Sequence, residues 1–208
     1  MEMDRLVGIF GLLFAAAISL RVYLVYRKTG RVPVILSSDD AAHDYIHKIL
    51  AGIFVLEAIN VLTFRLQALY DYVAAGQAPA LYAYLGPFRS LETPAVQVAG
   101  LAMAYLGLLW SIAAQHQMGR DWRIGIDFEH KTSLVTRGLY SGSRHPIYLG
   151  LIVICIGLFC ATPNVLTLIC AVLVTIVLSV EARLEEAFLL SLHGDAYQQY
   201  LARTRRWI

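Results

Sequence analysis

Apolar residues dominate five stretches of the chain, and polar or turn-forming residues separate these stretches. The apolar stretches span residues 6–26, 46–70, 94–114, 147–161 and 165–180. A helix rises about 1.5 Å per residue, so about 20 apolar residues cross a hydrocarbon layer of about 30 Å. The pattern therefore predicts an all-α fold, a polytopic membrane helix bundle of five transmembrane helices.

The last two stretches are separated only by Thr162, Pro163 and Asn164, a combination typical of a turn. We expect them to form a tight antiparallel hairpin, which brings their other ends together. Residues 147–161 make a helix only about 22 Å long, so the polar segment before it should dip into the interfacial layer. No linker or internal repeat interrupts the pattern, which indicates a single domain over residues 1–208.

Composition narrows the possible partners. Hydrophobic residues make up 58% of the chain and charged residues 15%, with a mean hydropathy of +0.61. The 17 basic residues nearly balance the 15 acidic ones, whereas nucleic-acid binding requires many unpaired cations. The three cysteines lie in one apolar region without the spacing of a metal site. We therefore expect membrane lipid and lipophilic small molecules as partners, and neither nucleic acid nor metal.

Basic residues indicate the orientation in the membrane. Most of the 17 lie after the first, third and fifth stretches, on segments that five crossings place on one side. Basic segments stay in the cytoplasm, so we expect the N-terminus outside and the C-terminus inside, as in a bacterial inner membrane. Arg21, near the end of the first stretch, is interpreted as reaching the interface. A cytoplasmic pocket is then expected between residues 115–145 and the C-terminal helices.

The polar segment 134–150 leads directly into the predicted fourth helix. Pro146 suits the first position of a helix, because its missing N–H would be unpaired there in any case. The free backbone N–H groups of this helix start lie beside Arg144 and His145. Such a start favours binding of a carboxylate or a phosphate.

Acidic residues lie where the last predicted span ends. Glu181 and Glu185 are four residues apart and share a helix face, whereas Glu186 points about 100° away from Glu185 and should matter less. The hairpin should bring Glu185 close to His145 and Tyr148. Carboxylates that face a helix start with an arginine and a histidine make a two-signed pocket, that is, a pocket with both negative and positive side chains. Such a pocket suits a ligand that carries an amino group and a carboxylate.

Three ordered motifs carry a resemblance to a known family. They are Leu134-Val-Thr-x-Gly-x-Tyr140, Arg144-His-Pro-x-Tyr-x-Gly150 and Glu185-Glu-x-x-Leu-x-x-x-x-Gly-x-x-Tyr-x-x-Tyr200. Residues 115–203 resemble the integral-membrane isoprenylcysteine carboxyl methyltransferases and their short bacterial relatives. The resemblance implies S-adenosylmethionine as cofactor and methyl transfer to a lipophilic acceptor that enters from the bilayer.

The resemblance also implies individual site residues. Segment 117–123 is similar to the loop that closes over the cofactor in the shorter relatives. Matched residue by residue, the motifs imply cofactor contacts for Ser133, Leu134, Val135, Tyr140, His145, Pro146, Ile147, Tyr148 and Glu185.

One position departs from the family pattern. Carboxyl-methylating members have an arginine four residues before the cofactor glutamate, and Glu181 stands there instead. Arg183 is the nearest basic residue and replaces that arginine only in a shifted register. We assign the acceptor chemistry to Glu181 and Arg183, and expect an acceptor that is cationic or loses a proton: a phenol, a thiol or an amine.

Several polar residues have a simpler interpretation. Asp40, His43, Asp44 and His47 have helical spacing, and we interpret them as a solvated helix start rather than a metal site. Glu57 and Asn60 either bond between helices or line the acceptor pocket. Tyr197 and Tyr200 are expected to pack beside a basic tail that anchors on lipid.

Two other functions stay open from the sequence. One is a membrane reductase of the sterol-reductase type, which uses NADPH, and the other is a non-enzymatic membrane scaffold. The Pro-x-Tyr that follows Arg144-His145 and the Glu185-Glu186 pair favour the methyltransferase over the reductase.

Overall fold

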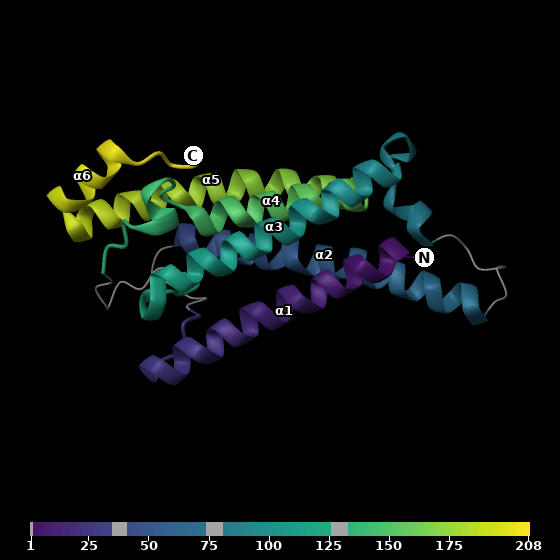
Figure 1. Ribbon diagram of the computed structural model, residues 1–208, viewed down its shortest axis with the longest axis horizontal. Helices are drawn as coiled ribbons and strands as arrows, with labels where there is room; N and C mark the ends of the chain where they lie inside the picture. The colour runs from purple at the N-terminus through teal and green to yellow at the C-terminus, as the bar shows by residue number, and fades with distance from the viewer. Residues whose placement is uncertain (1, 35–40, 74–80, 126–132) are drawn as a thin grey trace.

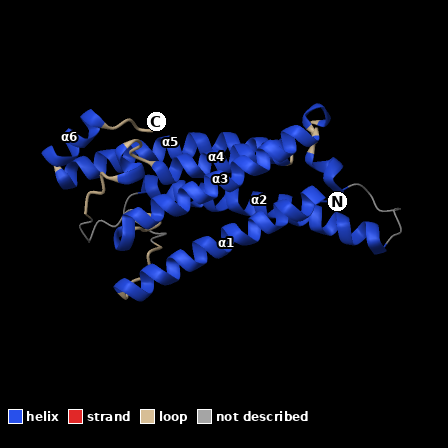
Figure 2. Ribbon diagram, in the orientation of Figure 1, coloured by secondary structure: helices blue, strands red, loops and turns tan. Residues whose placement is uncertain are grey.

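The computed structural model describes residues 2–34, 41–73, 81–125 and 133–208. Within these ranges the chain is all-helical and contains no β-strand, as the sequence predicts (Figure 2). Short 3₁₀ turns complete the connections. The α-helices are α1 (Glu2–Thr29), α2 (Ala41–Val73), α3 (Pro94–Met118), α4 (Pro146–Ala161), α5 (Val165–His193) and α6 (Asp195–Arg203).

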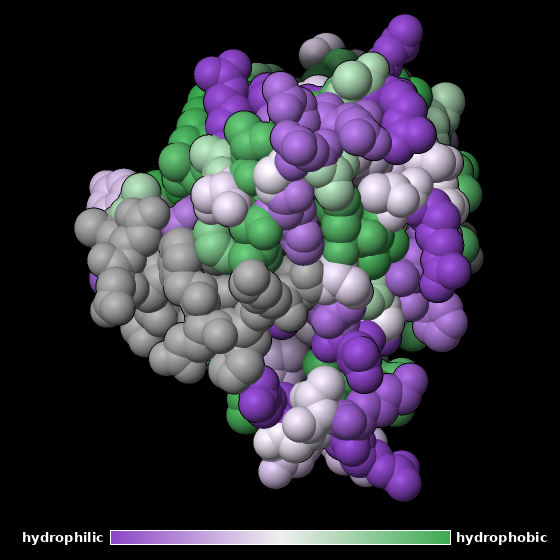
Figure 3. Space-filling view, turned by 90° about the vertical axis from the view of Figure 1, so that its left-hand side faces the viewer, coloured by the Kyte–Doolittle hydropathy of each residue, from purple (hydrophilic) through white to green (hydrophobic). Residues whose placement is uncertain are grey.

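Helices α1 to α5 run along the long axis of the molecule in alternating directions (Figure 1). Helices α1, α3 and α5 end, and α2 and α4 begin, at the same end of the bundle, which we call the cleft end. Helix α6 and the C-terminal tail also lie there. Seen face on, this end carries many hydrophilic side chains (Figure 3).

Among the described residues, four helices are long and apolar enough to cross a membrane: α1, α2, α3 and α5. The predicted count of five spans is not confirmed, because α4 has 16 residues. At about 1.5 Å per residue it is about 24 Å long, shorter than the hydrocarbon layer. Large apolar side chains of the long helices face outward, among them Leu12 and Leu106. Lipid tails accommodate such residues at no cost.

Glycines set the distance between α3 and α4. A Cβ atom on Gly157 would lie 2.6 Å from the backbone nitrogen of Ala104, and one on Gly107 would lie 2.9 Å from the carbonyl oxygen of Gly150. The two backbones therefore touch along a seam that only glycine permits. The indole N–H of Trp110 also donates to the carbonyl of Pro146 at 2.9 Å. These contacts fix the start of α4 against α3.

The predicted hairpin of α4 and α5 is present, and a buried polar network closes its tip. The Asn164 side chain accepts from the Thr167 backbone N–H at 3.0 Å and donates to the Asn60 side chain at 3.0 Å. Asn60 in turn donates to the Thr162 hydroxyl at 3.2 Å. Of the two alternatives for Asn60, the interhelical bond is therefore correct. The carboxyl oxygens of Glu57 are also buried, one turn away on α2.

Candidate active site

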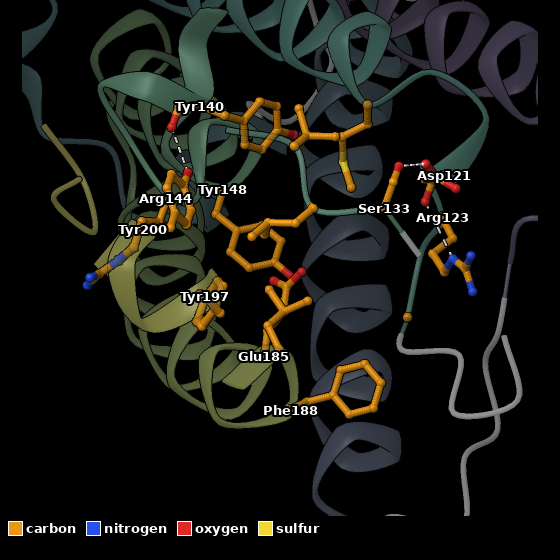
Figure 4. A pocket seen from close by; sticks show the side chains of 15 residues that line it. Asp121, Arg123, Ser133, Tyr140, Arg144, Tyr148, Glu185, Phe188, Tyr197 and Tyr200 are labelled. Atoms are coloured by element: carbon orange, nitrogen blue, oxygen red, sulfur yellow. Dashed lines mark hydrogen bonds between the residues drawn. The ribbon is translucent and has the colours of Figure 1, made fainter. Parts of the chain in front are cut away.

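A cleft opens at the cleft end of the bundle, between the segment that follows α3, the start of α4 and the end of α5 (Figure 4). A second hollow adjoins it and shares five of its residues, from Met118 to Val135. The cleft is lined by Met118, Asp121, Arg123, Gly125, Ser133, Leu134, Val135, Tyr140, Arg144, Tyr148, Glu185, Phe188, Leu189, Tyr197 and Tyr200.

The cleft gathers most of the residues that the sequence marked as cofactor contacts. Ser133, Leu134, Val135, Tyr140, Tyr148 and Glu185 line it, whereas His145, Pro146 and Ile147 do not. Pro146 is buried as the first residue of α4, and His145 lies directly behind Glu185. The structure thus brings the predicted residues together, and their role in binding a cofactor stays a prediction.

Arg21 of α1 holds the loop that follows α3. Its guanidinium donates hydrogen bonds to the carbonyls of Gln115 and Gly119 and lies 5.4 Å from the Trp122 ring centre. Arg21 therefore caps the end of α3, and its reach to the membrane interface stays a prediction. A cation that satisfies the free carbonyls at the end of α3 stabilises the turn at Gly119, where φ is +63°. This turn directs Asp121 toward Ser133, whose hydroxyl donates to the Asp121 carboxylate.

The segment from Gly138 to Ser143 forms the opposite wall. Gly138 has φ of +65°, and a Cβ atom there would lie 2.5 Å from the Gln117 side-chain oxygen. That oxygen accepts from the Leu139 backbone N–H at 2.8 Å, which ties this wall to α3. The Tyr200 hydroxyl donates to the Tyr140 carbonyl at 2.6 Å. Tyr200 therefore packs, as expected from the sequence, and also contributes to the cleft.

His145 connects the start of α4 to two carboxylates of α5. Its Nδ1 lies 3.3 Å from Glu185 and its Nε2 lies 3.2 Å from Glu186. Burial by itself lowers the pKa of the imidazole, but the hydrogen bonds to Glu185 and Glu186 outweigh burial, and the pKa of His145 lies above its ordinary value. The ring also stacks on Tyr148, with the ring planes 7° apart.

The predicted proximity of Glu185 to His145 and Tyr148 is confirmed by these contacts. The Tyr148 hydroxyl and the Glu185 carboxylate point toward one another inside the cleft (Figure 4). Glu185 therefore presents a carboxylate to the cleft while His145 holds it from behind. Guanidinium groups from Arg123 and Arg144 belong to the lining as well, so the cleft contains both signs of charge.

Glu186 does not line the cleft, and the expectation that its loss matters less for cofactor binding stays a prediction, but it contacts the residues that start α4. Its carboxylate accepts from Arg206 at 2.7 and 2.9 Å and lies 3.1 Å from Nε of Arg144. The Arg144 backbone N–H donates to the Arg205 carbonyl at 2.9 Å. Glu186 thus joins the C-terminal tail to the residues that start α4. Tail residues lie far from Glu186 in sequence, so helix geometry alone did not reveal them.

Glu181 and Arg183, the predicted acceptor residues, lie outside the cleft lining. Arg183 is exposed on another face of α5. Glu181 is buried, and both its oxygens lie 3.1 to 3.2 Å from Nδ1 of His43 on α2. His47 lies 3.9 Å from the same carboxylate.

The prediction that the start of α2 is solvated is therefore wrong for His43, which is buried. Asp44, by contrast, pairs with the exposed Lys48. Asp40 lies outside the described residues.

Sequence reasoning missed part of the lining. Phe188 and Leu189 were not predicted as lining residues. They lie three and four residues after Glu185 on α5, and this helical spacing was the signal that could have placed them on the same face as Glu185. Asp121 and Arg123 fall in the segment that resembles a closing loop. The sequence carried no signal for Arg21, because a single arginine in an apolar stretch does not reveal its partner.

These observations define a class of protein: an integral-membrane helix bundle with a polar, two-signed cleft at one end of its apolar spans. A family model, phospholipid methyltransferase, matches residues 95–196. This match runs from α3 to the beginning of α6, and it confirms for this part of the chain the resemblance to the isoprenylcysteine-type membrane methyltransferases. No curated protein matches the chain.

Proposed function

We propose that this protein transfers a methyl group from S-adenosylmethionine to a lipophilic acceptor that enters from the bilayer. The observation that carries the proposal is the meeting of Glu185 and Tyr148 in a cleft at the end of an apolar bundle, with His145 holding Glu185 from behind. The family match, which includes all three residues, supports methyl transfer as the reaction.

The cleft residues fit the proposed donor. The donor carries an amino group, a carboxylate and an adenine ring, and when bound it supplies an electrophilic methyl group on a sulfonium. Glu185 suits the amino group, and the guanidinium groups on the rim suit the carboxylate. Leu134, Val135 and Phe188 offer apolar surface to the ring. The chain contributes mainly by orienting the two reactants and by excluding water.

The acceptor class follows from the surroundings of position 181. A carboxylate acceptor requires a cation, but Glu181 is an acid whose partners are two histidines, and Arg183 is exposed elsewhere. This arrangement supports an acceptor that is cationic or loses a proton, such as a phenol, a thiol or an amine. A lipid with an amine head group is both cationic and able to lose a proton.

Calorimetry on the purified protein in lipid nanodiscs tests the donor. We expect S-adenosylmethionine to bind and NADPH not to bind. His145→Ala and Glu185→Ala should each weaken donor binding about 10-fold to 150-fold, because each removes a charge-assisted hydrogen bond of about 1.5 to 3 kcal/mol. His116→Ala, at an exposed site on α3, serves as the control. Binding of NADPH instead indicates a reductase, and binding of neither ligand indicates a scaffold.

A methylation assay tests the acceptor. Labelled donor is supplied with vesicles that contain phosphatidylethanolamine, or with a prenylated cysteine. We expect label in the amine lipid and little in the carboxylate. Efficient methylation of the prenylated cysteine contradicts the acceptor class but leaves the donor assignment intact.

The side of the membrane belongs to the same proposal. The donor is soluble and made in the cytoplasm, so we infer that the cleft end faces the cytoplasm, with the N-terminus outside, as in a bacterial inner membrane. The concentration of basic residues near the cleft end supports this orientation.

A further inference from the structure

Asp121 and Ser133 lie where the cleft and the second hollow join, because both residues line both hollows. The Ser133 hydroxyl donates to one oxygen of the Asp121 carboxylate (Figure 4). Among the described residues, the other oxygen of this carboxylate accepts no hydrogen bond. Glu185 lies elsewhere in the cleft, on α5. The junction therefore offers a ligand one free carboxylate oxygen and the oxygen of one hydroxyl.

The turn that carries Asp121 is anchored on both sides. Before it, Arg21 of α1 donates to the carbonyl of Gly119. After it, the Ile124 backbone N–H donates to the Pro33 carbonyl at 2.8 Å. A carboxylate on an anchored turn is in place before a ligand arrives, so binding does not have to order it. The anchors thus make Asp121 part of a built site rather than an isolated surface acid.

The two hollows carry different side chains on either side of this junction. In the cleft, Tyr148 and Glu185 point toward one another, and neither lines the second hollow. The residues that line the second hollow alone are Gln117, Gly119, Arg120, Thr136 and Arg137. The proposed donor likewise has three parts in order: an amino-acid end, a ribose and an adenine ring. Since Glu185 suits the amino-acid end, the ribose, which is the middle part, falls to the junction.

The chemistry of the junction matches a ribose. A ribose carries two adjacent hydroxyl groups, and each can donate a charge-assisted hydrogen bond to an ionised carboxylate. An acidic residue recognises a ribose hydroxyl in this way in dinucleotide-binding folds. The Ser133 hydroxyl oxygen can accept from the neighbouring hydroxyl. The ammonium of a lipid acceptor is the competing ligand, but Ser133 is exposed on the segment between α3 and α4, outside the spans along which a lipid lies.

We propose that Asp121, together with Ser133, binds the ribose of the donor; this rests on the proposed function. The free oxygen of the Asp121 carboxylate accepts from one ribose hydroxyl. Asp121 is then a specificity-determining residue, because a donor without that hydroxyl leaves the carboxylate without a partner in the cleft. The protein should therefore distinguish a ribose from a deoxyribose.

Calorimetry on the full chain in lipid nanodiscs tests the proposal with S-adenosylhomocysteine, the product form of the donor, and with its 2′-deoxy and 3′-deoxy analogues. In the wild type we expect one of the analogues to bind about 10-fold to 100-fold more weakly than the parent compound. Asp121→Ala should weaken binding of the parent compound by a similar factor and remove its advantage over that analogue. Asp195→Ala is the matched control, because Asp195 is an exposed aspartate of α6 that lines neither hollow.

A methylation assay separates the donor from the acceptor. In Asp121→Ala we expect the KM for S-adenosylmethionine to rise and the KM for phosphatidylethanolamine to stay close to that of the wild type. A higher KM for phosphatidylethanolamine alone assigns Asp121 to the acceptor ammonium and overturns the proposal. Should Asp121→Ala fail to fold, Asp121→Asn, which keeps the shape of the side chain, replaces it in both measurements with the same expected direction.

The wild type by itself separates the ribose site from the proposed function. If it binds neither S-adenosylmethionine nor S-adenosylhomocysteine, the proposed function is wrong, and the ribose site with it. If it binds the parent compound and both deoxy analogues equally well, the ribose site is wrong and the proposed function is unaffected. An Asp121→Ala protein that still prefers the parent compound also overturns the ribose site, since the preference then comes from another residue.

Discussion

At the scale of single residues, carboxylates of α5 organise the cleft end, and two of them, Glu185 and Glu186, share the partner His145. Glu181 contacts a histidine of α2, Glu185 contacts the first residues of α4 and the cleft, and Glu186 contacts the C-terminal tail. One helix thereby holds three other parts of the chain. Charged groups in such contacts are costly to leave unpaired, so removing one partner has a larger effect than its distance from the cleft suggests.

His145 predicts how stability changes with pH. Its pKa is raised in the folded protein, so its stabilising contribution is complete below the unfolded pKa of about 6.5 and is lost as pH rises through the higher folded pKa. We expect the difference in melting temperature between the wild type and His145→Asn to be large at pH 5.5 and to shrink toward pH 8.5. Scanning fluorimetry across this range measures it, and a constant difference contradicts the charged pair.

The Glu186–Arg206 pair predicts a measurable coupling energy. The two side chains are partly buried and make a bidentate contact. In a double-mutant cycle with Glu186→Gln and Arg206→Gln we expect a coupling of about 1 to 2 kcal/mol in the free energy of unfolding. The Arg89–Glu92 pair, in which the arginine is exposed, has a similar distance of 2.8 Å and is the control, with an expected coupling below about 0.5 kcal/mol. Equal coupling energies for the two pairs would show that burial does not strengthen the Glu186–Arg206 pair.

At the scale of elements, the α3–α4 seam determines where the cleft lies. Because α4 is too short to be positioned by the bilayer alone, its place depends on contact with α3 and on the hairpin to α5. The tail adds a third contact, since Ser143 and Arg144 bond to the backbone of Arg205 and Arg206. The start of α4 is therefore held from three directions.

Gly157→Ala should destabilise the protein by about 1 to 3 kcal/mol, because the new methyl group would lie 2.6 Å from the backbone of α3 and force the helices apart. Gly52→Ala is the control, because no atom lies within 4 Å of its added Cβ. Thermal unfolding in detergent measures both. A Gly157→Ala protein as stable as Gly52→Ala would mean that α3 and α4 do not pack this closely.

At the scale of the whole molecule, the cleft end carries many hydrophilic side chains (Figure 3). The long helices expose large apolar side chains along their length, among them Leu12 and Leu106. A soluble donor and a membrane-embedded acceptor meet only at such a boundary. Under the proposed function, the orientation of the bundle determines which compartment supplies the donor.

Cysteine labelling in intact cells tests the orientation. Tyr84→Cys lies in an exposed turn at the end opposite the cleft, and Arg137→Cys is exposed at the cleft end. We expect a membrane-impermeant maleimide to label Tyr84→Cys directly and Arg137→Cys only after the cells are made permeable. The native cysteines are not exposed, so the unaltered protein serves as the background. The reverse pattern contradicts the orientation.

The sequence by itself determined the apolar helices, the hairpin and the meeting of Glu185 with His145. These follow from local rules: apolar length defines a span, and a three-residue turn leaves its two helices only one way to pack. Only the tertiary structure decided the contacts that join distant helices. His43 and Glu181 are 138 residues apart, and Arg21 is 98 residues from Gly119. Which face of α2 meets α5, and whether α4 is a full span, depend on the packing of all the helices together, and no local pattern records that packing.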